Sequence, residues 1–385
     1  MGLADALIPG VASNAAALGS RKQLKFKEFT SSGSFVIGAN GDATTSATML
    51  NVILVGGGGG GGCGSVTANG AGTVTVTVGG AGGGGEVGKF SIPALSLIGG
   101  SASGTVTVTI GAGGVAGSGA NGGTAAVGGD SAFGNYQVFG GGRGASSIMN
   151  NNVESGATSI TGQNVLRFTQ GAARRSDSSG TATQHKFSGT GGGGGGVPWR
   201  MATPSDLTES TNWYTWGEQN GKRAGGTAAA GISPDSYTPV AYALTSLNNA
   251  TYTPGGRGGA SSFSTAVGDG WYGRGGDGDS GLGGGGAGGV VSTTGTSIAT
   301  VLVLNSSYWA NDYNQSRFYH RDGGGRGAII TAATTANYIA ATSGAANTGG
   351  GGGAGAAWAT ATTVYNSVSA GGSGAAGYCL VYWWE

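Results

Sequence analysis

The stretch MLNVILVGGGGGGG, residues 49–62, decides the fold class of this chain. Its first half is an apolar, β-branched run, which predicts a buried β-strand over residues 49–55. Its second half consists of seven consecutive glycines, Gly56–Gly62. Glycine buries no side chain and loses more conformational entropy on folding than any other residue. An ordered glycine tract must therefore be held through its backbone N–H and C=O groups.

The polyproline II helix offers such a solution for the glycine tracts. It has three residues per turn and no internal hydrogen bonds, so its backbone groups point outward toward neighbours. Seven glycines in this conformation span roughly 22 Å at ~3.1 Å per residue. We therefore predict a lattice of polyglycine II helices, with tracts 191–196, 283–286 and 349–353 extended, adjacent and hydrogen-bonded to each other. The alternative is a β-sandwich that carries glycine-rich loops.

The composition excludes several other classes of protein. The chain has 385 residues, of which 89 are glycine and 7 proline, with 9% charged residues and a formal net charge of +1. It lacks the Gly-X-Y period of collagen and any run of 18 apolar residues, which a transmembrane helix would need. The near-zero charge argues against a nucleic-acid binder. Two histidines and two cysteines leave little material for a metal cluster or a disulfide framework, so we expect no cofactor and no metal.

Working outward, further segments predict β-strands. LKFKEF (24–29) alternates Leu24 and Phe26 with lysines, the pattern of a half-buried strand whose apolar residues face the core. TVTVTV (73–78) and TVTVTI (105–110) predict antiparallel strands with one solvated face. More strands are expected in SGSFVIG (32–38), in GGDSAFGNYQVFGGG (128–142) and in the closing segment GYCLVYWWE (377–385). The predicted fold is mainly β with very little helix: an antiparallel β-rich part followed by a polyglycine-II-like lattice with long loops.

Composition changes along the chain divide it into three parts. Residues 1–23 are alanine-rich and lack a basic start before their apolar stretch, so they fit an attachment arm better than a secretory signal. Residues 24–140 form the β-rich part with glycine runs. Residues 141–385 form a glycine-rich scaffold with variable aromatic insertions and a closing C-terminal strand. Its internal repeats are GGRGASS (141–147), GGRGGASSF (255–263) and GGGRG (323–327).

The order of these segments resembles a known family. FTSSGSF, then LNVILVGGGGGGG, then TVTVTIGAGG and finally GYCLVYWW are similar to the glycine-rich domain of bacteriophage tail fibres and tail-tip proteins. The later half resembles tail-fibre adhesins in which glycine motifs form a polyglycine II sandwich and the loops between them touch the host receptor. The resemblance covers about residues 26–385. The long insertions and the regular TVTVTV and TVTVTI strands depart from a pure polyglycine sandwich.

The resemblance implies a role and a set of partners. We expect a non-enzymatic virion tail protein, assembled in the host cytoplasm, that binds an outer-membrane protein or a surface polysaccharide of the host. Residues 1–23 are expected to contact other tail proteins. Fibre tips are often trimers whereas sandwich-type adhesins can be monomeric, and we favour a homotrimer. Neither nucleic-acid binding nor membrane insertion is expected. Three alternatives stay open: a purely structural tail component, a capsule depolymerase, and a glycine-rich wall protein from outside viruses.

Aromatic residues mark the predicted receptor-binding surface. All eight tryptophans follow residue 198, and the glycine-free insertions also concentrate tyrosines. Tyrosine and tryptophan give large contact area at low rotamer cost, which suits recognition loops; local packing under each loop is the alternative. The segments 212–216 and 306–322 are the strongest candidates because they mix rings with polar residues. The predicted contact residues are Trp199, Trp213, Tyr214, Trp216, Trp271, Tyr272, Tyr308, Trp309, Tyr313, Phe318, Tyr319, His320 and Trp358.

Four arginines flanked by glycines, Arg143, Arg257, Arg274 and Arg326, either tie down carbonyls at the ends of tracts or stay solvated.

Other polar residues give weaker signals. Asp277 and Asp279 lie in a Gly-Asp turn that faintly resembles a calcium-binding repeat; only one copy is present, so a solvated turn is favoured and an ion site stays the alternative. A depolymerase would need paired carboxylates, and the spacing of Asp269, Asp277, Asp312 and Asp322 singles out no pair. Cys63 and Cys379 are expected to be buried free thiols, which approach each other if the ends of the domain meet.

Overall fold

The computed structural model describes about half of the chain. The described residues are 22–45, 49–69, 73–118, 125–144, 174–176, 182–184, 199–201, 250–253, 255–256, 258, 262–264, 278–292, 323–331, 338–358, 367–368 and 370–385. Within them the fold is mainly β, as the sequence predicts. The helix α2 (Ala94–Leu97) has four residues, and no helix in the described part of the chain is long and apolar enough to cross a membrane.

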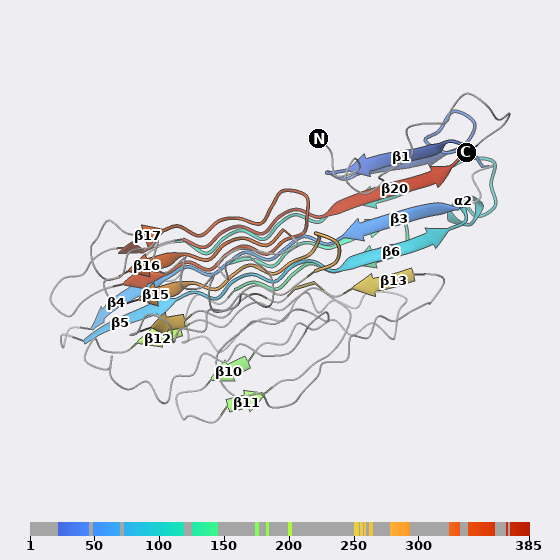
Figure 1. Cartoon of the computed structure of the whole chain (residues 1–385). Coiled ribbons are helices and arrows are strands. Elements are labelled where there is room, and N and C mark those ends of the chain that lie inside the picture. Colours follow the sequence, from blue (N-terminus) through green and yellow to red (C-terminus); the bar gives the residue numbers. More distant parts are fainter. Residues whose placement is uncertain are drawn as a thin grey trace, which may run out of the picture.

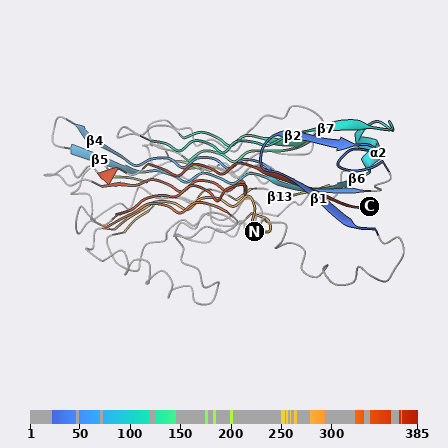
Figure 2. The same cartoon turned by 90° about the horizontal axis from the view of Figure 1, so that it is seen from above.

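One end of the molecule is a β-sandwich, called the sandwich end below. Its first sheet has the order β1 (Leu24–Phe29), β20 (Tyr378–Trp384), β3 (Leu50–Val55), β6 (Val87–Ile92) and β13 (Ala250–Thr253), all antiparallel. Its second sheet has the order β2 (Gly33–Ile37), β7 (Gly104–Thr109), β8 (Ser131–Phe133) and β9 (Tyr136–Val138). Figure 2 shows the sheets as two layers, with β2 and β7 on one side and β1 and β6 on the other.

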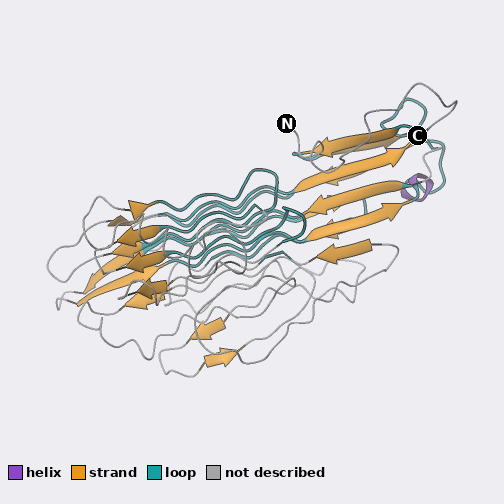
Figure 3. Ribbon diagram, viewed as in Figure 1, coloured by secondary structure: helices purple, strands orange, loops and turns teal. Residues whose placement is uncertain are grey.

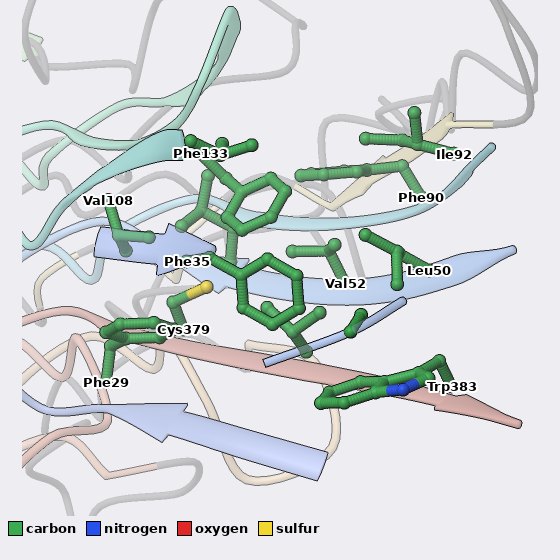
Figure 4. Packing of buried hydrophobic residues seen from close by; sticks show 14 of the residues in the cluster. Phe29, Phe35, Leu50, Val52, Phe90, Ile92, Val108, Phe133, Cys379 and Trp383 are labelled. Atoms are coloured by element: carbon green, nitrogen blue, oxygen red, sulfur yellow. The ribbon is translucent and has the colours of Figure 1, made fainter. Parts of the chain in front are cut away.

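The hydrophobic core lies between these two sheets. Phe35 of β2 is fully buried and packs edge-on against Phe133 of β8 and Trp383 of β20, with ring centroids 5.8 and 5.4 Å apart (Figure 4). The predicted strand at 105–110 has the expected pattern, since Val106 and Val108 are buried and its threonines are exposed. The closing aromatic strand, β20, lies inside the first sheet between β1 and β3.

Strand β1 forms where predicted, but the face that it turns to the core is not the predicted one. Phe26 is 54% exposed, whereas Phe29 is buried. The reason is register: Phe29 and Lys27 lie opposite Cys379 and Val381, which face the core. Lys27 is tolerated there because its ammonium pairs with Asp42 at 2.8 Å and lies 5.1 Å from the centroid of the Phe29 ring. The expectation that Leu24 and Phe26 form the buried face is therefore wrong.

Beyond the sandwich, the strands continue into extended glycine tracts that belong to no sheet (Figure 3). The central tract is Gly56–Gly62, and its N–H groups follow a period of three. Residues 56, 59 and 62 donate to one antiparallel tract, 80–86; residues 57 and 60 donate to a second, 126–129; residues 58 and 61 donate to a third, 372–375. All these hydrogen bonds are 2.8 or 2.9 Å long.

The carbonyl groups of the same tract bind three further neighbours. Residues 141 and 144 donate to Gly57 and Gly60, residues 114 and 117 donate to Gly58 and Gly61, and residues 352 and 355 donate to Gly59 and Gly62. Six chains thus surround the central tract, three antiparallel and three parallel to it. This is the arrangement expected of polyglycine II helices with three residues per turn.

The predicted adjacency of two of the glycine tracts is confirmed. Gly351 donates to the carbonyl of Gly284 at 2.8 Å, so tracts 283–286 and 349–353 are direct neighbours. Only their first residues, Gly283 and Gly349, have positive φ, where the chain turns into the lattice. The third tract of that prediction, 191–196, lies outside the described residues. Below, "the lattice" denotes the tracts 56–62, 79–86, 111–117, 125–129, 139–144, 284–289, 323–328, 340–345, 349–356 and 370–377.

The buried hydroxyl of Ser131 joins the sandwich to the lattice. It donates to the carbonyl of Val55, the last residue of β3, at 2.7 Å and accepts from the amide of Gly111 at 2.9 Å. Two residues further along the chain, Gly57 already bonds directly to Gly129, which leads into the opposite sheet. The two layers converge here because glycines replace the side chains that hold packed sheets about 10 Å apart.

Candidate functional site

The far end of the lattice, called the distal end below, carries short strands. They form a three-stranded group of β4 (Ser65–Asn69), β5 (Thr73–Val78) and β12 (Trp199–Met201), and a four-stranded group of β14 (Ser262–Ser264), β15 (Val290–Ser292), β16 (Ile329–Thr331) and β17 (Tyr338–Ile339). A hairpin of β18 (Ala357–Trp358) and β19 (Ser367–Val368) lies against β4 and β5. Figure 1 shows β4, β5, β12, β15, β16 and β17 at the end opposite β1 and β20. The pair β10 (Arg174–Ser176) and β11 (Ala182–Gln184) forms a separate ribbon.

Glycine tracts lead directly into these strands. Tract 56–62 continues through Cys63 and Gly64 into β4, tract 284–289 runs into β15, and tract 323–328 runs into β16. Because each tract is fixed by its neighbours in the lattice, the lattice sets the position and direction of every strand that it delivers.

Two of the three sequence repeats, 255–263 and 323–327, lead to the strands on either side of β15. β14, which ends the repeat at 255–263, pairs in parallel with β15, and β15 pairs in parallel with β16. Val290 lies opposite Ser262 on one side and Ile329 on the other. Parallel neighbours end at the same edge of a sheet, so the chain segments that follow these strands all start from one edge.

Two of the predicted contact residues lie on distal strands. Trp199 is the first residue of β12, where it pairs with Val78 of β5. Trp358 is the last residue of β18, in the hairpin beside β4 and β5. Each of the other predicted residues belongs to a segment that directly follows a distal strand. Trp213, Tyr214 and Trp216 follow β12; Trp271 and Tyr272 follow β14; Tyr308, Trp309, Tyr313, Phe318, Tyr319 and His320 follow β15.

The structure describes the backbone of Trp199 and Trp358 only, and the other eleven predicted contact residues lie outside the described residues. The structure therefore places only the strands that precede these residues, and all of those strands lie at the distal end. Asp269, Asp277, Asp312 and Asp322 also lie outside the described residues, so the choice between a binding surface and a depolymerase stays a prediction.

Arginines flanked by glycines do reach neighbouring carbonyls. Arg143 donates to the carbonyl of Ala125 at 3.5 Å, and Arg326 donates to the carbonyl of Ala340 at 3.4 Å. Both hydrogen bonds are long, and both link adjacent tracts near the surface of the lattice. This supports the interpretation of these two side chains as ties between tracts; Arg257 and Arg274 lie outside the described residues.

Asp279, from the Gly-Asp turn, is occupied by protein partners. Its carboxylate forms an ion pair with Lys89 at 2.9 Å and accepts hydrogen bonds from Thr253 and Ser280. Burial opposes ionisation of this carboxyl group, but the hydrogen bonds and the lysine outweigh it and lower its pKa. Within the described residues no group of three or more potential metal-ligating side chains gathers. Asp279 thus holds the turn at 278–282 against β6.

The C-terminal residue of the chain is similarly held at the sandwich end. The carboxylate of Glu385 accepts from Lys25 at 2.7 Å and from the amide of Thr44 at 2.9 Å, and these bonds lower its pKa to about 2. Its backbone pairs with that of Gln23. This pairing fixes the point at which residues 1–21 join the described chain.

Both cysteines are buried and neither forms a disulfide, as predicted. Burial raises the pKa of the Cys379 thiol, which favours an inert, protonated side chain. Cys379 lies opposite Leu54 at the sandwich end, whereas Cys63 lies beyond Gly62 at the other end of the central tract. The length of the lattice therefore separates the two thiols.

Sequence reasoning missed one exposed surface at the sandwich end. Phe26 and Trp384 are 54% and 46% exposed on the outer face of the first sheet. Phe26 lies opposite Tyr382, and Leu24 lies opposite Trp384. The signal that could have revealed this surface is the alternation within YCLVYWW: if Cys379, Val381 and Trp383 face the core, Tyr382 and Trp384 must face outward.

Comparison with known proteins adds no further assignment: no protein-family model matches this chain, and a search of curated proteins gives no match.

Proposed function

We propose that this chain is a bacteriophage tail-fibre or tail-tip adhesin, a virion protein that attaches the particle to a receptor on the host surface and has no enzymatic activity. Residues 1–23 join it to other tail proteins, and the segments after the distal strands contact an outer-membrane protein or a surface polysaccharide. The protein assembles in the host cytoplasm. The homotrimer expected from the resemblance stays a prediction.

The observation that carries this proposal is the common origin of the aromatic segments. All thirteen predicted contact residues lie on a distal strand or in a segment that directly follows one. Binding residues concentrate on loops that a rigid scaffold positions. A lattice in which six chains surround a central tract is such a scaffold, because every tract is held by hydrogen bonds along its length.

The polarity of the molecule supports the same proposal. Gln23 and Glu385 pair at the sandwich end, so residues 1–21 join the described chain there, opposite the distal strands (Figure 1). Attachment through residues 1–23 would place the sandwich end against the tail and direct the distal end outward.

The proposal is tested by adsorption of particles to host cells. Replacing Trp213 or Trp309 with alanine is expected to cost roughly 2 kcal/mol or more of binding free energy if the ring is a hot spot, with an unchanged melting temperature. Leu95→Ala is the matched control, because Leu95 is 45% exposed at the sandwich end and should affect neither property. Lower melting temperature with normal adsorption would instead support local packing of the rings and a structural role.

A further inference from the structure

The outer face of the first sheet is covered on its lattice side and open on the other. Near the lattice, Leu282 packs on Val55, Val87, Tyr378 and Leu380, which are all buried. The ion pair between Asp279 and Lys89 holds the turn that carries Leu282 in place. This half of the face shows what the sheet requires: an apolar side chain laid across its outer surface.

The other half of the same face has no such cover among the described residues. It consists of Leu24, Phe26, Tyr382 and Trp384, called the aromatic strip below. Leu24 faces Trp384 and Phe26 faces Tyr382 across the β1–β20 ladder, so the four side chains lie on one surface. Phe26 and Trp384 are about half exposed, and Leu24 and Tyr382 are partly buried.

Charge is excluded from the centre of this strip. The nearest acidic group on the same face of β1, Glu28, accepts a hydrogen bond of 2.9 Å from the hydroxyl of Tyr378. Lys25 is turned to the opposite face and pairs with Glu385. A contiguous exposed group of large apolar and aromatic residues with a polar margin marks an interaction site, and phenylalanine, tyrosine and tryptophan are typical of the centres of interfaces.

We infer that the aromatic strip is the docking surface for a neighbouring tail protein, which covers it with an uncharged, apolar segment as Leu282 covers the other half. This inference rests on the proposed function. It is favoured by the point at which residues 1–21 join the described chain, at Lys22, two residues before Leu24 and beside Glu385. Those residues contain only two charged side chains, Asp5 and Arg21. The expected attachment arm therefore joins the described chain beside the strip.

The test compares particles that carry the wild-type protein with particles that carry Phe26→Ser together with Trp384→Ser. We expect incorporation of the double variant into purified particles, measured by immunoblot, to fall at least about tenfold, with unchanged melting temperature of the isolated protein. The melting temperature stays because both side chains are about half exposed. Leu95→Ser is the control, since it removes a similarly exposed apolar residue from the same end and should incorporate normally.

Three results would overturn the inference. If the double variant is incorporated as well as the wild type, the aromatic strip takes no part in attachment, and the proposed function is unaffected. If light scattering shows that the wild type self-associates and that the double variant does not, the strip binds a second copy of this chain. Protection of residues 3–18 from hydrogen exchange in the isolated wild type, lost in the double variant, would identify the chain's own arm. Absence of the wild type itself from particles would contradict the proposed function instead.

Discussion

The two halves of residues 50–62 are held by different forces although they form one continuous extended chain. In the first half, Leu50, Val52 and Leu54 are buried in the sandwich core, and strand β3 pairs with β20 and β6 in its sheet. In the second half, Gly56–Gly62 buries no side chain and bonds to six tracts. Hydrophobic burial stabilises one half, and backbone hydrogen bonding stabilises the other.

The comparison shows that the side chain controls the distance between layers. Where strands carry side chains, the two sheets stay apart and their backbones pair with each other only within one layer. Where glycines follow, chains from both layers touch and bond directly, as Gly57 does with Gly129. The loss of side chains where glycines begin therefore converts the sandwich into a lattice, while each chain keeps its direction. The two regions should therefore respond to mutation in opposite ways. Removing carbon atoms should destabilise the sandwich, and adding them should destabilise the lattice.

The largest effect is expected from one added methyl group in the lattice. In Gly59→Ala the new β-carbon would overlap the carbonyl oxygen of Gly142. Moving that tract away would break the bonds that Gly141 and Gly144 donate to the central tract, and each lost buried bond costs about 1–3 kcal/mol. We expect a loss of more than about 4 kcal/mol, seen as a fall of at least about 5 °C in melting temperature or as failure to fold.

Ala112→Val is the matched control for this substitution, because it adds two carbon atoms at an exposed position of the lattice surface. It should change stability by no more than about 0.5 kcal/mol. If Gly59→Ala melts like the control, the close packing of the tracts does not hold the lattice together.

The sandwich should respond to a deletion, by a smaller amount. Leu54 is fully buried in the core, and Leu54→Ala should destabilise by about 2–4 kcal/mol through lost burial and the cavity left behind. Its melting temperature, measured beside that of Gly59→Ala, would show whether adding one carbon to the lattice costs more than removing three from the core. The reverse ranking would mean that the core, and not the lattice, dominates the stability of the whole chain.

The sequence predicted those elements whose side chains define a face. The strands at 50–55, 73–78 and 378–384 form where expected, because their apolar or alternating patterns fit only a strand. The face of β1 was wrong, because LKFKEF offers an apolar face and a cationic face. The choice depends on pairing with Cys379 and Val381, and not on β1 itself.

The choice of neighbours in the lattice could not be predicted. One glycine tract is chemically identical to another, so nothing in Gly56–Gly62 specifies that it bonds to tracts 80–86, 126–129 and 372–375. For the same reason, no sequence pattern indicated that this tract, from the β-rich first part, is the centre of a lattice shared with tracts beyond residue 140. At the candidate site, the aromatic insertions were visible in the sequence, whereas their common origin at the distal strands depends on the parallel pairing of β14, β15 and β16.

The smallest expected effect on stability concerns the surface of the lattice, where side chains return with a period of three. In tract 111–118, Gly111, Gly114 and Gly117 are buried, whereas Ala112, Val115 and Ser118 are exposed, Val115 by 68%. A polyglycine II helix has three residues per turn, so these residues form one outward row. Ala340 and Ser343 repeat this spacing on another exposed tract. Among the described residues, the amides of Ala112 and Val115 have no hydrogen-bond partner.

These outward side chains should end the lattice, because a further tract cannot approach a β-carbon as closely as it approaches glycine. Replacing Ala112, Val115 and Ser118 together with glycine would leave an edge like the interior, with free amides and no β-carbons. We expect the triple variant to fold but to self-associate at micromolar concentration, seen as a rise in mass above the wild type in light scattering. The matched control, Ala112→Ser with Val115→Thr and Ser118→Ala, keeps every β-carbon and should retain the wild-type mass. Glycine tracts pack in both parallel and antiparallel directions around Gly56–Gly62, so a second copy could add to the new edge in either direction. A triple variant that also keeps the wild-type mass would therefore show that these side chains do not set the boundary of the lattice.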